Sequence, residues 1–282
     1  MGAVPLRQIV FLGLVFAGVL AFTLGRWWVR RLRRQRQRAR PFPPEWEAIL
    51  DRNVGLYRHL PAALRQDLHG HIQVFLAEKH FEGCGGLKIT EEIRVTVAAQ
   101  ACILLLNRTT DFYPRLSTIL VYPGVYRPRR FTGPGLRHEL ADTVNAGESW
   151  PTGAVVLAWD EVQRGAMDVA HKANVVLHEF AHQLDQEDGA ADGAPVLERP
   201  SSYATWARVF GQEYAALQER AARGQPTLLD QYGATNPAEF FAVATETFFE
   251  QPLRMQSEHP ELYAELKAYY RLDPAEWLKA NT

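Results

Sequence analysis

The sequence predicts an α+β protein in which a few short strands precede a largely helical second half. Residues 119–122 (ILVY) and 153–159 (GAVVLAW) are short apolar runs followed by turn or polar residues, as is typical of buried strands. Most of the chain after residue 160 is predicted to be helical. Strands and helices that are separated along the chain in this way are typical of α+β domains.

The chain has 282 residues, of which 47% are hydrophobic, and a formal net charge of -1. This size and composition suit one large globular domain with additional segments. Eight arginines lie between residues 26 and 40, so the rest of the chain is correspondingly acidic, and it is not expected to bind nucleic acid directly. The two cysteines, Cys84 and Cys102, do not make a disulfide framework and are compatible with a reducing compartment.

The sequence predicts four segments. A short tail at residues 1–8 precedes one transmembrane helix at residues 9–29, and a linker rich in arginine and proline at residues 30–43 leads to the main domain at residues 44–282. Residues 9–25 carry no charge, and Trp27 and Trp28 suit a membrane interface. Only Arg7 precedes this uncharged run, whereas eight arginines follow it, at residues 26–40. The positive-inside rule therefore places the main domain in the cytoplasm, at the inner membrane. A cleaved signal peptide is the alternative, which this charge distribution disfavours.

Apolar residues at helical spacing predict further helices at residues 46–56, 61–79, 91–107 and 206–223. Thr90 is a suitable N-cap for the third of these helices. Asp160 or Asp168 is expected to start the helix that continues to Leu184. A turn is expected at residues 83–86, and a loop-rich stretch at residues 127–150.

The predicted helix that ends at Leu184 contains the pattern His-Glu-x-x-His, formed by His178, Glu179 and His182. Side chains at positions i and i+4 lie on one face of a helix, so both imidazoles can reach one metal ion. Glu179 can act as general base on a water molecule that the metal activates, as in zinc hydrolases. The segment is apolar nearly all round, and two histidines and a glutamate in a buried helix are costly without a partner. The alternative is a core helix whose histidines make ordinary hydrogen bonds.

A second polar stretch lies in a helix that Pro237 is expected to begin, after a cap at Thr235 or Asn236. Glu239 and Glu246 are seven residues apart, so they share one face of this helix, among phenylalanines. A carboxylate in apolar surroundings requires a cation or strong donors, and two histidines leave a zinc site short of a ligand. The spacing alone does not choose between Glu239 and Glu246 as that ligand.

Two aspartates that follow the motif are further candidates. Asp188 lies six residues after His182, where another class of zinc peptidase has its third ligand, but that pattern requires glycine at the position of Asp185. Asp185 lies three residues after His182 and can orient a ligand histidine through a hydrogen bond. Both aspartates can equally be solvated loop residues.

HEFAHQLD at residues 178–185, combined with YGATNPAEFFAVATETFFE at residues 232–250, resembles the Mlc titration factor A family of zinc peptidases. FEGCGGLKITEEIRVTVAAQACILLL and GAVVLAW are also similar to that family, so the resemblance covers most of residues 46–277. The second of the two motifs is similar to a segment of anthrax lethal factor as well. The resemblance implies a zincin-like metallopeptidase domain of the His-Glu-x-x-His type, mostly helical with a small sheet.

The resemblance also implies the roles of the site residues. It implies one zinc ion per chain, held by His178, His182 and Glu239, with Glu179 as the general base. The hydroxyl of Tyr232 is expected to face the substrate carbonyl and to stabilise its oxyanion. The family is linked to aminopeptidase-type activity on peptide or protein substrates and to a glucose-responsive transcriptional repressor as a binding partner, so both are expected here.

The sequence therefore favours a zinc-dependent peptidase, in which the strand at residues 153–159 receives an extended peptide along its edge. The alternative is a non-catalytic, zinc-braced protein that sequesters a regulator at the membrane. Glu179 favours the enzyme, because a structural zinc site does not need a general base. A third alternative is nucleic acid binding through the arginine run, for which contact with anionic lipid is the simpler interpretation.

Overall fold

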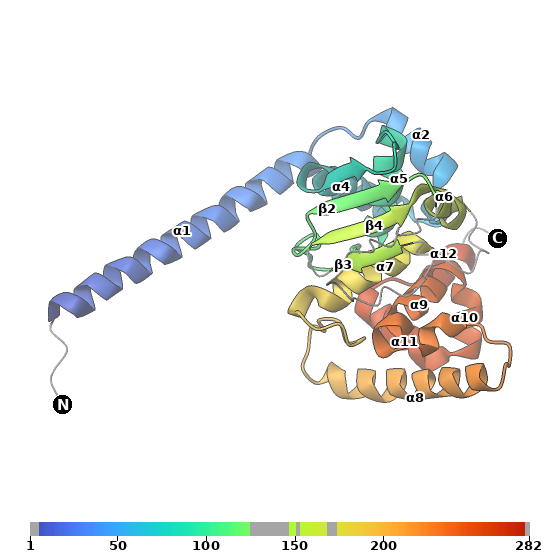
Figure 1. Ribbon diagram of the computed structural model, residues 1–282. Helices are drawn as coiled ribbons and strands as arrows, with labels where there is room; N and C mark the ends of the chain where they lie inside the picture. The colour runs from blue at the N-terminus through green and yellow to red at the C-terminus, as the bar shows by residue number, and fades with distance from the viewer. Residues whose placement is uncertain (1–5, 125–146, 151–152, 168–173, 280–282) are drawn as a thin grey trace, which may run out of the picture. The chain divides into compact units, whose positions relative to one another are not determined.

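The computed structural model describes residues 6–124, 147–150, 153–167 and 174–279 (Figure 1). The chain divides into two units, Met1–Pro41 and Phe42–Thr282. The first unit contains helix α1 (Leu6–Arg38), whose last turn holds two arginines, where basic side chains interact favourably with the helix dipole. Within the described residues, no helix combines the length and the apolar character that a membrane crossing requires, so the transmembrane helix predicted over residues 9–29 is not supported.

The described residues of the second unit form a four-stranded sheet with the strand order β1-β2-β4-β3. The strands are β1 (His80–Gly83), β2 (Thr118–Tyr122), β3 (Gly147–Trp150) and β4 (Ala154–Ala158). β1, β2 and β4 are parallel, and β3 runs antiparallel to β4. Ile119 is paired with Val155 and Val121 with Leu157, and all four side chains are fully buried. The predicted α+β class is confirmed, because this small sheet is accompanied by helices over most of the described chain.

The two strands that were predicted from apolar runs are β2 and β4. The strands β1 and β3 were not predicted. β1 has the sequence HFEG, which offers no apolar alternation over its four residues, and its Gly83 was expected in a turn. β3 lies in the stretch that was expected to be loop-rich, of which residues 127–146 lie outside the described residues. β4 lies between β2 and β3, so the prediction that a peptide pairs with the edge of this strand is wrong. Among the described strands, β3 forms the edge on this side of the sheet.

The helices before the sheet and between its strands are α2 (Pro44–Asn53), α3 (Gly55–His59), α4 (Ala62–Glu78) and α5 (Glu91–Ile103). The helix predicted over residues 46–56 is interrupted at Val54, whose extended backbone separates α2 from α3. Thr90 caps α5 as predicted, because its side chain accepts a hydrogen bond from the backbone N–H of Ile93 at 3.3 Å. α5 ends four residues earlier than predicted.

Helix α6 (Trp159–Met167) follows the sheet, and α7 (Val175–Asp185) contains the His-Glu-x-x-His residues. Of the two predicted starting residues, Asp160 lies in the first turn of α6, and Asp168 lies outside the described residues. α7 itself begins after Asn174, whose side chain accepts a hydrogen bond from a backbone N–H of the first turn. The segment with the His-Glu-x-x-His pattern is therefore a separate helix with its own cap.

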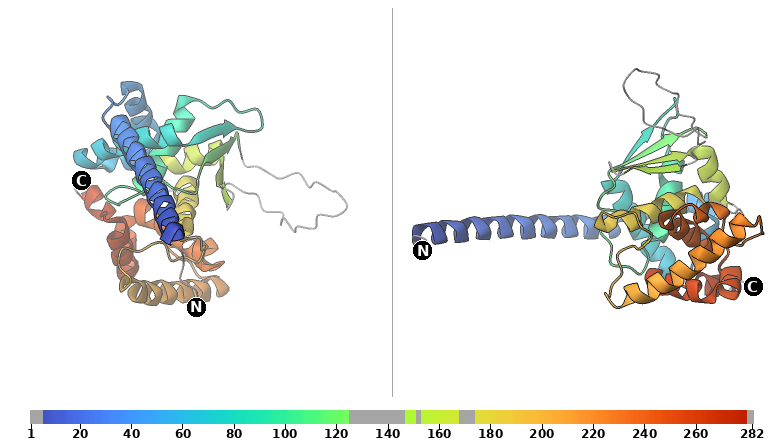
Figure 2. Two further views of the ribbon diagram at one scale, coloured as in Figure 1. Left: turned by 90° about the vertical axis from the view of Figure 1, so that its left-hand side faces the viewer. Right: turned by 60° about the horizontal axis from the view of Figure 1, so that its bottom comes forward.

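The second half of the domain is helical, with α8 (Ser202–Ala222), α9 (Pro237–Glu250), α10 (Pro252–Glu258), α11 (Pro260–Tyr270) and α12 (Pro274–Lys279). The last four begin with proline, whose fixed φ and missing N–H suit the first turn of a helix. α7 lies between the sheet and these helices (Figures 1 and 2). It packs against α9, which is buried along nearly its whole length.

The loop between α7 and α8 is fixed by one glycine. Gly193 has φ +78°, and a Cβ atom at this position would lie 2.3 Å from the carbonyl oxygen of Pro237. Its N–H donates to Asp185 Oδ2 at 3.0 Å, and its carbonyl accepts from Trp206 Nε1 at 3.0 Å. Gly193 therefore connects the end of α7, the start of α8 and the start of α9.

We predict that Gly193→Ala lowers the free energy of unfolding by more than about 1 kcal/mol, because alanine is strained at this φ and its Cβ displaces the start of α9. Gly211→Ala is the matched control: Gly211 lies within α8 with no atom within 4 Å of an added Cβ. The control should be stabilised by up to about 1 kcal/mol, because alanine favours the helix. Urea unfolding of both full-length variants measures this, and equal stability of the two would contradict the role given to Gly193.

Candidate metal centre

Helix α7 presents two histidines on one face. His178 and His182 are one turn apart, and their Nε2 atoms are 3.2 Å apart. The planes of the two rings differ by 79°, and their centroids are 4.8 Å apart. The two side chains are only 14% and 11% exposed, so neither imidazole is fully solvated.

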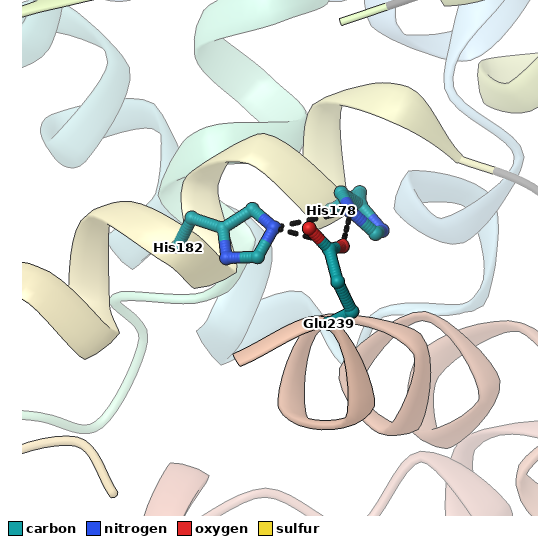
Figure 3. A group of neighbouring side chains, drawn as sticks. All are labelled: His178, His182 and Glu239. Carbon is teal, nitrogen blue, oxygen red and sulfur yellow. Dashed lines mark hydrogen bonds and ion pairs between the residues drawn. The ribbon is translucent and has the colours of Figure 1, made fainter. Parts of the chain in front are cut away.

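Helix α9 brings a carboxylate to the same point. Its N-cap is Asn236 rather than Thr235, and the Asn236 side chain accepts a hydrogen bond from the backbone N–H of Glu239 at 2.9 Å. Glu239 Oε2 lies 2.9 Å from His178 Nε2 and 3.2 Å from His182 Nε2. Figure 3 shows the two imidazoles of one helix and the carboxylate of the other pointing toward one another.

The three side chains fit a metal ion. Among the described residues, His178, His182 and Glu239 form the group of potential ligands whose atoms all lie within 4.8 Å of one another. Bonds of about 2.1 Å from zinc, at tetrahedral angles, separate ligand atoms by about 3.4 Å. The separations of 2.9–3.2 Å in this group are close to that value. Two imidazoles and one carboxylate also form a known ligand set of catalytic zinc.

Hydrogen bonds within the cluster shift the pKa values of its side chains. Burial alone would lower the pKa of His178, but hydrogen bonds to Glu239 and Glu246 raise this pKa well above its usual range. Burial opposes ionisation of Glu239, yet hydrogen bonds with His178 and His182 lower its pKa to about 2. The carboxylate and the imidazoles are thus stabilised by a positive charge between them, which a proton or a metal ion can supply.

Glu246 and Asp188, the other candidate ligands, do not join the group formed by His178, His182 and Glu239. Glu246 Oε1 is 2.7 Å from Nδ1 of His178, the ring nitrogen that faces away from Glu239, and Glu246 Oε2 accepts from the backbone N–H of Asn174 at 2.6 Å. Asp188 is exposed, and its Oδ1 accepts from the backbone N–H of Ala190. The seven-residue spacing placed Glu246 on the correct face of α9, but its contacts with His178 and Asn174 were not predicted.

Asp185 was expected to orient a histidine. The hydrogen bond that the structure gives it joins Oδ2 to the N–H of Gly193, and Oδ1 is buried without a hydrogen-bond partner among the described residues. Burial raises the pKa of Asp185 to about 6. Its carboxylate therefore holds the loop after α7 rather than an imidazole.

Glu179 lies beside the histidine pair and is only 5% exposed. Burial raises its pKa to about 7, although the nearby histidines lower it. A carboxyl group with a pKa near neutrality can both accept and return a proton at physiological pH, which is the requirement for a general base. Among the described residues, Glu179 makes no hydrogen bond with the three candidate ligands, so its carboxylate can contact a water molecule or a substrate.

Tyr232 lies in the short 3-10 helix Gln231–Ala234, which precedes α9. The side chain of Asp230 holds this turn by accepting from the N–H of Tyr232 at 2.8 Å. The ring centroid of Tyr232 is 6.0 Å from that of His178, and the side chain is 56% exposed. Partial burial and the negative charges of Glu239 and Glu179 raise its pKa, so the hydroxyl stays protonated and can donate a hydrogen bond.

A His-Glu-x-x-His helix that faces a glutamate from a second helix, beside a small mixed sheet, defines a protein of the metallopeptidase class. The chain belongs to the family described as glucose-regulated metallo-peptidase M90, whose model matches residues 28–271. The match includes both motifs and nearly all of the second unit.

Several relatives are similar over most of their length. Uncharacterized protein slr2042 of Synechocystis sp. is 46% identical over 237 residues, which are 83% of this chain and 86% of the relative. Mlc titration factor A of Pectobacterium atrosepticum is 30% identical over 240 residues, covering 83% of this chain and 88% of that protein. The protein of the same name from Klebsiella pneumoniae is 29% identical over 241 residues, with 84% and 89% covered. The resemblance to the Mlc titration factor A family is therefore confirmed.

We predict that Glu239→Ala sharply weakens zinc binding, because it removes the only carboxylate oxygen near both Nε2 atoms among the described residues. Asp188→Ala should bind zinc like the wild type, since the Asp188 side chain is exposed and makes a local turn. Zinc content at low free metal, measured on both purified variants, is the test. Full occupancy in Glu239→Ala, with loss in Asp188→Ala, would overturn the assignment.

Proposed function

We propose that the protein is a zinc-dependent peptidase. The observation that supports this most strongly is the donor set: the described residues supply three ligand atoms, whereas a closed structural zinc site has four protein ligands. Glu179 lies beside this incomplete set with a buried carboxylate. An open position together with an adjacent base suits hydrolysis better than structural bracing.

The positions of the residues support the roles that we propose for them. His178, His182 and Glu239 would hold the zinc ion, which would act as a Lewis acid and increase the acidity of water. Glu179 accepts the proton of the attacking water and delivers it to the leaving amine. The hydroxyl of Tyr232 donates a hydrogen bond to the oxygen of the substrate carbonyl as negative charge develops on it.

The proposed substrate is an extended peptide that adds to the edge of β3 with which no described strand pairs. Among the described strands, β3 pairs with β4 alone, and α7 packs against β3. A peptide that pairs with this edge through backbone hydrogen bonds would run alongside the helix that carries the histidines. A more specific proposal is that the protein has aminopeptidase-type activity. The protein should then cleave peptides with a free N-terminus and should not cleave the same peptides after N-acetylation.

A non-catalytic binding protein is the second candidate function. It is supported by the name of two relatives, Mlc titration factor A, which describes the titration of another protein, Mlc. On this basis a transcriptional repressor is a proposed partner of this chain. Binding of such a partner requires no general base, so the effect of replacing Glu179 distinguishes the two functions.

We predict that Glu179→Gln lowers peptide hydrolysis at least about a hundredfold, because the amide cannot accept the proton of the attacking water. Zinc content and folding should be nearly unchanged, since Glu179 is not among the candidate ligands. Tyr232→Phe is a companion variant that should also retain zinc and lose mainly turnover. Hydrolysis at the wild-type rate by zinc-loaded Glu179→Gln would exclude this mechanism.

A separate proposal concerns location and rests on the sequence alone. The uncharged residues 9–25 and the arginines after them suggest attachment to the inner membrane with the main domain in the cytoplasm. The full chain should then stay with the membrane fraction in high salt, and a variant lacking residues 9–29 should not. A reporter fused after Thr282 should behave as cytoplasmic. Release of the full chain by high salt alone would contradict a membrane span.

A further inference from the structure

We propose that Glu246 is a positioning residue that selects the metal-binding tautomer of His178 and holds the start of α7. Glu246 lies on α9, is 6% exposed, and uses both carboxylate oxygens. Oε1 is 2.7 Å from His178 Nδ1, and Oε2 accepts from the N–H of Asn174 at 2.6 Å. The inference rests on the proposed function in one respect, namely that His178 binds zinc.

The first contact determines which nitrogen of His178 carries the proton. A carboxylate offers only acceptors, so Nδ1 must be the donor in this hydrogen bond. In the neutral ring, a proton on Nδ1 leaves the lone pair on Nε2. Nε2 is the atom that lies 2.9 Å from Glu239 and 3.2 Å from His182 Nε2. Glu246 therefore prepares His178 to bind a cation on the side where the other two ligands converge.

The second contact fixes the helix that carries both histidines. Asn174 is the N-cap of α7: its Oδ1 accepts from the N–H of Leu177 at 3.1 Å, and its Nδ2 donates to the carbonyl of Gly165 in α6. Its own backbone N–H has Glu246 as acceptor. One carboxylate thus holds the position of α7 against α9 and the orientation of the first histidine.

Two of the three glutamates of α9 act on His178, one at each ring nitrogen. Glu239 faces Nε2 and Glu246 faces Nδ1, and both side chains belong to one rigid helix. Because the two residues are seven positions apart, they lie on the same face about 10 Å apart along the axis. Any displacement of α9 relative to α7 would change both contacts at once.

Replacement by glutamine tests this arrangement with almost no change in shape. Glu246 faces two donors, the N–H of Asn174 and Nδ1–H of His178, whereas an amide has one oxygen and one NH₂ group. A glutamine that accepts from Asn174 presents its NH₂ group to Nδ1 and favours a proton on Nε2, where it blocks the metal. A glutamine that accepts from His178 leaves two donors opposed at Asn174, which is also unfavourable.

The experiment compares full-length wild type, Glu246→Gln and Thr247→Val. Thr247 is the next residue of α9, equally buried, and its hydroxyl donates to Val243 within the helix, so Thr247→Val is a nearly isosteric control for loss of a buried polar group. Zinc affinity, measured by competition with a chelator, should fall roughly 10- to 100-fold in Glu246→Gln, as expected for a residue that orients a metal ligand. The control should bind zinc like the wild type.

A second measurement separates positioning from general packing. Nitrogen NMR of zinc-loaded protein with labelled histidine should show a proton on Nδ1 of His178 that is protected from exchange, and Glu246→Gln should shift or lose this signal. A variant that is merely less stable would show a lower melting temperature with unchanged signal and affinity. Wild-type affinity in Glu246→Gln overturns the proposal, as does the absence of the protected proton in the wild type. Neither measurement uses hydrolysis. The peptidase assignment is tested separately, by the rate of peptide hydrolysis in Glu179→Gln.

Discussion

The convergence of His178 Nε2, His182 Nε2 and Glu239 Oε2 within 3.2 Å of one another is the constraint to which the rest of the domain is adapted. Hydrogen bonds between the imidazoles and the carboxylate join these atoms and favour a positive charge between them. The fold must keep α7 and α9 in close register for these contacts to form. It does so at both ends of α7: Glu246 and Asn174 join its start to α9, and Asp185 and Gly193 join its end to the first turn of α9.

Burial of apolar side chains stabilises the fold, whereas burial of these polar groups lowers its stability. The four phenylalanines of α9 are at most 1% exposed, and burial of each contributes about 1.5–3 kcal/mol. Against this stand two carboxyl groups whose burial raises their pKa, Glu179 to about 7 and Asp185 to about 6. Between the pKa of an unfolded carboxyl, about 4, and these raised values, the folded protein binds more protons than the unfolded chain. These two groups therefore cost stability as the pH rises toward neutrality, and the aromatic core offsets that cost.

Local patterns in the sequence predicted the parts of the site that depend on local geometry. The His-Glu-x-x-His pattern places its two histidines together because the helical repeat alone decides this, and Thr90 caps its helix for an equally local reason. The choice between Glu239 and Glu246 is not local, because it depends on how α9 crosses α7. Both carboxylates contact His178, on opposite nitrogens, so residue type and helical face could not separate them. The strands β1 and β3 were missed for a similar reason: each has four residues and is defined by its partner strand rather than by its own pattern.

The position of Glu179 bears most directly on the choice between a peptidase and a binding protein. A carboxylate that is 5% exposed carries a desolvation cost that an apolar residue would avoid. Asp185 and Glu246 each accept a backbone N–H, and these bonds hold the ends of α7 in place. Glu179 has no comparable structural contact among the described residues, yet it lies beside the three candidate ligands. Capture of a partner at the surface would gain nothing from a buried group with a pKa near 7, whereas proton transfer to and from water uses that property directly. The physical cost of Glu179 therefore favours the proposed peptidase over a binding protein.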